Sequence, residues 1–335
     1  MRYFLILVII ITSLLPIAEL NAQSDRLNIV TTTTILADVV QNVVGNAADV
    51  TSLMGISTDP HSFQPTTRDI ITLDEANVIF INGINLESGL RDILGETDPA
   101  KVVPLSTCVP VLTGFEHDED VEHQATEISG ASGEQCAAHY EELNLTPDET
   151  PFFQADCRDC DPHVWFDVQN VMLWTLLIRD TLSQFDPVNA LVYAENTAAY
   201  LLELTKLDEE ILTLVEAIPE NSRLLVTNHG VLGYFAHRYN FEVAATILPG
   251  FSTGVEPGPR EVLEVIQILE DTGTPAIFVD NSSSADTAAQ IASEAGVKVI
   301  VLYTESLSTE AGGAATYIDY MRYDAAHIAT ALSGD

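Results

Sequence analysis

Short apolar runs alternate with amphipathic segments along most of the chain. In the first third, the predicted strands are residues 26–30, 50–54, 77–82 and 101–105. Two segments between them, 34–45 and 68–76, are predicted helices; the first repeats apolar side chains at helical spacing, at Ile35, Val39 and Val43. Strands that alternate with helices are typical of βαβ units with a parallel sheet. The pattern therefore predicts an α/β lobe.

The same alternation returns in the last third of the chain, after Pro219. The predicted strands there are residues 223–228, 242–248, 276–281 and 297–303. The predicted helices are residues 231–239, 259–273, 285–296 and 315–332. We therefore expect a second α/β lobe with a parallel sheet of its own.

Two further helical segments lie between the predicted lobes. The first covers residues 168–185, and the second runs from Asn189 to about Ile218, a length of roughly 45 Å at 1.5 Å per residue. We interpret the second as a rigid helix that joins two lobes, because a crossover helix within one domain needs less length. The alternative is a long surface helix on a single domain. The predicted parts are an N-terminal lobe at residues 23–186, the joining helix at 187–218 and a C-terminal lobe at 219–335.

An acidic, polar insertion interrupts the first lobe at about residues 106–160. It shows no clear periodicity, as is usual for a functional or mobile loop. It contains all the cysteines of the chain, Cys108, Cys136, Cys157 and Cys160. In an exported protein an even number of cysteines predicts disulfides, here two, and three connectivities are possible. A bond from Cys108 to Cys157 or Cys160 would close a loop of about 50 residues.

The N-terminal residues predict export. Residues 1–22 contain Arg2, an apolar run to Ile17 and a small residue, Ala22, which is the layout of a secretory signal peptide. The alternative is an uncleaved anchor helix, although the apolar run is short for a membrane span. No cysteine follows the run closely, so we do not expect a lipid anchor. We expect a periplasmic or otherwise extracytoplasmic protein.

The charge is strongly negative, with 13 Lys and Arg against 50 Asp and Glu and a formal net charge of −37. Such a charge repels nucleic acids and anionic membranes and attracts cations. We therefore expect no nucleic-acid partner. Acidic surfaces are also common in proteins adapted to salt, so the charge alone does not indicate a cation ligand.

The tripeptide Asp-Pro-His occurs at residues 59–61 and again at 161–163. Proline fixes its own φ and restricts the residue before it, so each motif holds its histidine in a stiff turn. A metal site needs ligands that are positioned before the ion arrives. We therefore take His61 and His163 as candidate metal ligands.

His229 and Glu305 complete a candidate metal site. His229 follows the predicted strand 223–228, and Glu305 follows the strand 297–303 by two residues. In open α/β sheets, ligands bind beyond the carboxyl ends of the strands, where His61 also lies. With His163, two groups come from each lobe, and three imidazoles with one carboxylate suit Zn²⁺. The alternative for each histidine alone is an ordinary core or surface residue, and water could replace Glu305 as fourth ligand.

The other histidines give weaker signals. His117, His123 and His139 lie in the acidic insertion, where they could capture metal loosely or could be solvated. His237 and His327 lie within predicted helices, at surface or packed positions.

The segments TTTTILADVV, TDPHSFQPT, DPHVWFD, TNHGVLGYFAHRY, VEPGPREVLEVI and YIDYMRYD resemble the zinc and manganese solute-binding proteins of ABC importers. The similarity covers nearly the whole mature chain apart from the insertion. It implies two α/β lobes joined by a long rigid helix, and metal ligands at His61, His163 and His229. The family usually has Asp where this chain has Glu305. Manganese members typically carry Glu at the position of His229, so this residue favours zinc.

The resemblance implies a zinc receptor that works with an ABC permease and its ATPase and catalyses no reaction. We expect it to be monomeric. Alternatives are a manganese receptor of the same family, a secreted zinc hydrolase that uses Glu305 as base, and a secreted structural protein stabilised by metal. Against the hydrolase, the chain has no H-E-x-x-H or nucleophile motif.

Overall fold

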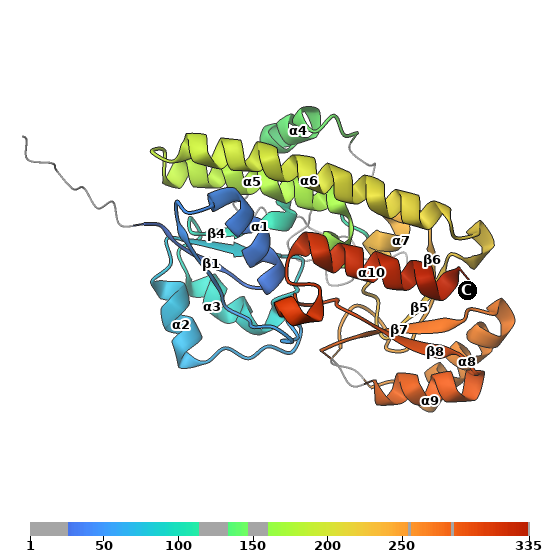
Figure 1. Ribbon diagram of the computed structural model, residues 1–335. Helices are drawn as coiled ribbons and strands as arrows, with labels where there is room; N and C mark the ends of the chain where they lie inside the picture. Colours follow the sequence, from blue (N-terminus) through green and yellow to red (C-terminus); the bar gives the residue numbers. More distant parts are fainter. Residues whose placement is uncertain (1–25, 114–132, 147–159, 254–255, 283–284, 334–335) are drawn as a thin grey trace, which may run out of the picture.

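Two parallel sheets form the framework of the molecule (Figure 1). The computed structural model describes residues 26–113, 133–146, 160–253, 256–282 and 285–333. The first sheet, in the order β2-β1-β3-β4, contains β1 (Asn28–Thr31), β2 (Asp49–Ser52), β3 (Val78–Ile81) and β4 (Val102–Pro104). The second, in the order β6-β5-β7-β8, contains β5 (Leu224–Thr227), β6 (Glu242–Thr246), β7 (Ala276–Asp280) and β8 (Lys298–Leu302). All these strand pairs are parallel, which confirms the predicted fold class.

The helices of the first lobe are α1 (Thr34–Val44), α2 (Thr67–Asp74) and the short α3 (Arg91–Glu96). Helix α1 begins where the Thr33 side chain accepts a hydrogen bond from the Leu36 amide, and it ends at Gly45 with a φ of 56°. Its Ile35, Val39 and Val43 side chains are fully buried. The predicted helical face of α1 therefore faces the core.

The two long helices α5 (Val168–Phe185) and α6 (Ala190–Glu216) lie side by side, and α6 continues over the second lobe (Figure 1). Helix α6 has 27 residues, so it is about 40 Å long. Near its start, Asn196 donates to the Val43 carbonyl of α1 at 3.0 Å, and near its end Glu210 accepts from Arg322 at 2.7 Å. Helix α6 thus contacts elements of both lobes, as the predicted joining helix should.

The second lobe carries α7 (Gly233–Tyr239), α8 (Pro259–Thr272), α9 (Asp286–Ala295) and α10 (Tyr317–Leu332). Helix α8 begins with a proline, whose missing N–H costs nothing in the first turn, and ends before Gly273, which has a φ of 69°. Its Val265 and Leu269 side chains pack with Ile277 of β7 and Ile291 of α9 in a small core. This core covers one face of the second sheet.

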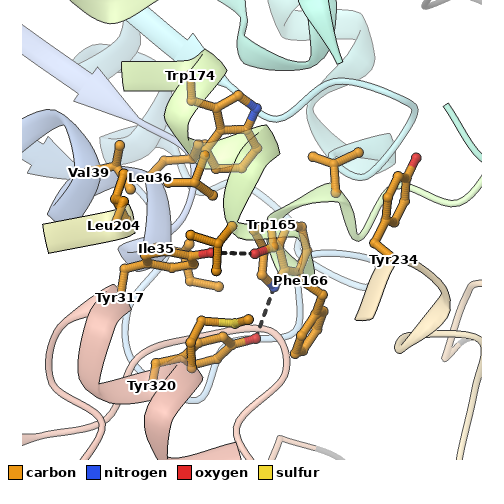
Figure 2. Packing of buried hydrophobic residues seen from close by; sticks show 14 of the residues in the cluster. Ile35, Leu36, Val39, Trp165, Phe166, Trp174, Leu204, Tyr234, Tyr317 and Tyr320 are labelled. Atoms are coloured by element: carbon orange, nitrogen blue, oxygen red, sulfur yellow. Dashed lines mark hydrogen bonds between the residues drawn. The ribbon is translucent and has the colours of Figure 1, made fainter. Parts of the chain in front are cut away.

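The main core is continuous between the lobes (Figure 2). It joins Ile35 of α1 and Leu204 of α6 to the aromatic side chains that precede α5 and those of α10. Tyr317 donates to the Trp165 carbonyl at 2.7 Å, and the Trp165 indole N–H lies 2.9 Å from the Tyr320 hydroxyl. Because the contact between the lobes is apolar and buried, large lobe rotations would expose core surface.

The insertion contains a helix that the sequence pattern does not predict, α4 (Gly133–Glu142). A disulfide joins Cys136 of α4 to Cys108, which rules out the bonds from Cys108 to Cys157 or Cys160. Cys160 is also disulfide-bonded, whereas Cys157 lies outside the described residues. At the base of the insertion, Thr113 forms an antiparallel bridge with Cys160. The insertion, predicted to be a functional or mobile loop, therefore contains a regular helix at residues 133–142.

Among the described helices, none is both long enough and apolar enough to cross a membrane. The predicted signal peptide, residues 1–22, lies outside the described part of the chain.

Candidate metal centre

The four predicted ligands come together between the two lobes. His61 lies in the loop between β2 and α2, and His163 lies just before α5. His229 and Glu305 follow β5 and β8 at the carboxyl edge of the second sheet. One nitrogen from each histidine and one oxygen of Glu305 all lie within 4.8 Å of one another. The structure thus assembles the His₃Glu group predicted from the sequence, with two members from each lobe.

Glu305 Oε1 is at the centre of this group. It lies 3.2 Å from Nε2 of His163, 3.2 Å from Nε2 of His229 and 3.6 Å from Nε2 of His61. The Nε2 atoms of His61 and His163 are 3.1 Å apart. The side chains of His163, His229 and Glu305 are fully buried, whereas His61 keeps 6% of its side-chain surface exposed. Four donor atoms therefore converge in a space sheltered from solvent, with His61 on the solvent side.

The charges within the group depend on one another. Burial opposes protonation of His163, but Glu305 and Asp161 outweigh it and raise the pKa of His163 to about 10. Burial would raise the pKa of Glu305, yet the imidazoles, His163 above all, hold this pKa well below its usual range. Burial lowers the pKa of His229. Without a metal, a proton on His163 thus balances the charge of Glu305.

The aspartates of the two Asp-Pro-His motifs hold the backbone of the histidines. Asp59 Oδ1 accepts from the His61 amide at 2.8 Å, and Asp161 Oδ1 accepts from the His163 amide at 2.9 Å. Asp161 Oδ1 also lies 2.7 Å from Nδ1 of His163. A carboxylate on Nδ1 orients the ring and leaves Nε2 for a metal. The sequence predicts that these motifs are stiff turns, but this role of the aspartates was not predicted.

The donor set fits a divalent cation. Glu305 Oε2 is buried without a hydrogen-bond partner, although a buried carboxylate oxygen normally has one. A cation that bound both oxygens of Glu305 would satisfy it. Three imidazoles and a carboxylate are ligands that Zn²⁺ favours, and Mn²⁺ also accepts carboxylate and imidazole ligands.

Two further residues near Glu305 were not identified from the sequence. Trp165 donates from its indole N–H to the carbonyl of Thr304 at 3.1 Å, which fixes the loop that carries Glu305. Asp280, at the end of β7, is buried, and burial together with the charge of Glu305 raises its pKa. The sequence could have indicated Asp280 as a residue near the site, because it lies at the end of a predicted strand, as His229 and Glu305 follow predicted strands.

The other described histidines lie away from this group. His139 of α4 is buried and lies 2.8 Å from Asp180 of α5, so it packs α4 against α5 and is not solvated, and it belongs to no candidate metal group within the described part of the chain. His327 stacks on Tyr323 within α10, and His237 lies in α7. His117 and His123 lie outside the described residues.

Known proteins are similar to this chain in sequence and in fold. The manganese-binding lipoprotein MntA of Halalkalibacterium halodurans is 29% identical, over 93% of this chain and 91% of its own length. The manganese ABC transporter substrate-binding lipoprotein PsaA of Streptococcus pneumoniae is 27% identical over the same shares. The periplasmic zinc-binding protein TroA from Treponema pallidum superposes with a TM-score of 0.74 at 24% identity, over 92% of this chain and 99% of its own.

A family model described as zinc-uptake complex component A, periplasmic, matches residues 29–331, which is most of the chain. The match confirms the resemblance seen in the sequence motifs and excludes the hydrolase alternative, because the members are receptors. The chain belongs to the zinc-uptake complex component A family, the metal-binding substrate receptors of ABC importers, and it is not an enzyme.

Proposed function

We propose that this protein is an extracytoplasmic zinc receptor that binds one Zn²⁺ through His61, His163, His229 and Glu305. The observation that carries the proposal is the convergence of four donor atoms within 4.8 Å, with the buried Glu305 Oε2 lacking a partner. Metal-binding members of such importers release the ion to a membrane permease driven by an ATPase. We propose the same partners here, and a monomeric receptor.

The donor set favours zinc. Nitrogen ligands suit Zn²⁺ better than Mn²⁺, and three of the four ligands are imidazoles. The second candidate is Mn²⁺, because the relatives MntA and PsaA are described as manganese-binding or manganese-transporting proteins. Glu305, with one methylene more than the Asp usual in the family, can reach the ion with one or both oxygens.

The domain limits and the route of export remain part of the proposal. We place the signal peptide at residues 1–22, the first lobe at 23–186, the joining helix at 187–218 and the second lobe at 219–335. The relatives MntA and PsaA are described as lipoproteins. We propose that this chain, too, acts outside the cytoplasm.

A competition titration tests the metal assignment. The purified mature protein should bind one Zn²⁺ per chain, and more tightly than Mn²⁺, when a fluorescent chelator competes for the ion. His229→Ala should weaken zinc binding by more than about 100-fold, because losing a ligand costs more than the 10- to 100-fold typical of losing a residue that orients one. His327→Ala is the matched control, since this histidine lies outside the site. A preference for Mn²⁺ would refute the zinc assignment, and unchanged binding by His229→Ala would refute the site.

A further inference from the structure

The two Asp-Pro-His motifs use their aspartates differently. Each carboxylate accepts from the amide of the histidine two residues later. The carboxylate of Asp161 then contacts the ring of its own His163. Oδ2 of Asp59 instead accepts from the hydroxyl of Thr253 at 2.5 Å, across a sequence separation of 194 residues, and from the hydroxyl of Ser62 in its own loop at 3.0 Å. The first motif therefore contributes a contact between the lobes in addition to a candidate ligand.

Thr253 belongs to a segment that packs against the His229 loop. The amide of Gly230, the residue after His229, donates to the carbonyl of Gly250 at 2.9 Å. A Cβ atom on Gly230 would lie 2.9 Å from the ring of Phe251, so the two segments are in close contact. The Asp59–Thr253 hydrogen bond thus connects the loop of His61 to the segment that supports His229.

Among the described residues, a second hydrogen bond joins the loop of His61 to the second lobe. The amide of Ser57 donates to the hydroxyl of Ser306, next to Glu305, at 2.9 Å. Gly55, Ile56 and Ser57 are exposed. The other three candidate ligands are fully buried, whereas the side chain of His61 is 6% exposed. His61 is therefore the candidate ligand that lies nearest to solvent.

We propose that the Asp59–Thr253 hydrogen bond is a latch that holds the His61 loop over the bound metal and sets the rate of metal dissociation. Asp59 and Thr253 act as positioning residues, and neither binds the ion. The inference rests on the proposed function, because it takes His61 as a ligand. With the latch broken, His61 moves away more often, and the ion leaves from a site with three remaining ligands.

Stopped-flow displacement of Zn²⁺ by excess chelator measures this rate. Thr253→Val removes the hydroxyl but keeps the shape, and it should accelerate dissociation about tenfold, the effect of losing one charge-assisted hydrogen bond. Thr253→Ser keeps the hydroxyl and should restore a rate close to that of the wild type. Asp59→Asn, which keeps an acceptor oxygen without the charge, should give an intermediate rate. The association rate constant should stay the same in all variants.

Thr205→Val is the matched control, because Thr205 donates an exposed hydrogen bond to Leu201 within α6, far from the site. It should dissociate zinc at the wild-type rate. Equal rates for wild type and Thr253→Val, or equal acceleration by Thr253→Ser, would overturn the latch alone. Zinc binding by His61→Ala as tight as that of the wild type would overturn the ligand set itself. Urea unfolding without metal checks that each variant is folded.

Discussion

Metal binding should release about one proton at neutral pH. His163 Nε2 lies 3.2 Å from Glu305 Oε1, and Nδ1 lies 2.7 Å from Asp161 Oδ1. Burial opposes a charge on the ring, but the two carboxylates prevail and raise the pKa of His163 to about 10. Nε2 can bind a metal only after its proton has left. At pH 7 the metal must therefore displace the proton that His163 carries.

The size of the effect follows from this pKa. At pH 7, about three units below this pKa, the metal competes with the proton for His163. The apparent affinity for the metal is therefore about 1,000-fold weaker, or about 4 kcal/mol less favourable, than for the protein with His163 deprotonated. Because His163 is protonated below its pKa, binding strengthens as the pH rises. The dissociation constant should fall about tenfold for each pH unit between roughly 7 and 9.

Isothermal titration calorimetry in two buffers with different ionisation enthalpies counts the released protons directly. The expected count is about one at pH 7.5. Asp161→Asn removes one of the carboxylates that raise the pKa of His163, so this variant should release fewer protons per bound metal than the wild type. A count near zero together with the same affinity at pH 7 and pH 8 would refute the account of His163.

Three further predictions concern stability in urea. Burial raises the pKa of Asp167 to about 7 despite Arg238, so the unfolded chain loses this proton first and stability falls as the pH rises. Asp167→Asn keeps the acceptor oxygen of the helix cap but cannot titrate. Its free energy of unfolding should therefore fall by about 3 kcal/mol less than that of the wild type between pH 5 and pH 8, and an equal fall would contradict this. The disulfide between Cys108 and Cys136 has a sequence separation of 28, and replacing both residues by Ala should cost about 3.5 kcal/mol. Trp174 is fully buried, and Trp174→Ala should lower the free energy of unfolding by about 3 to 5 kcal/mol. A loss below about 1 kcal/mol would contradict this and show that the surrounding core collapses into the cavity.

The regular elements could be predicted where the periodicity of apolar residues is strong. In α1, Ile35, Val39 and Val43 mark the buried face, and the structure buries all three. The insertion helix α4 could not be predicted in this way, because contacts with distant residues hold it. Its Cys136 is bonded to Cys108, and its His139 lies beside Asp180 of α5. Tertiary contacts of this kind leave no periodic signal in a short segment.

The candidate ligands could be predicted because strand ends meet at one edge of a parallel sheet and because Asp-Pro-His occurs twice. The different roles of the aspartates could not. Both motifs have the same three residues, yet Asp161 contacts its own histidine and Asp59 contacts Thr253 in the other lobe. The partner of each carboxylate depends on which segments the fold brings near, and the motif carries no information on that.

The most direct test of the metal centre is a crystal structure of the zinc-loaded protein with anomalous diffraction data collected on both sides of the zinc absorption edge. We predict one strong zinc peak per chain, within about 2.0 to 2.2 Å of Nε2 of His61, His163 and His229 and of an oxygen of Glu305. A peak among other side chains, or a zinc ion that leaves any of these three histidines unbound, would contradict the account.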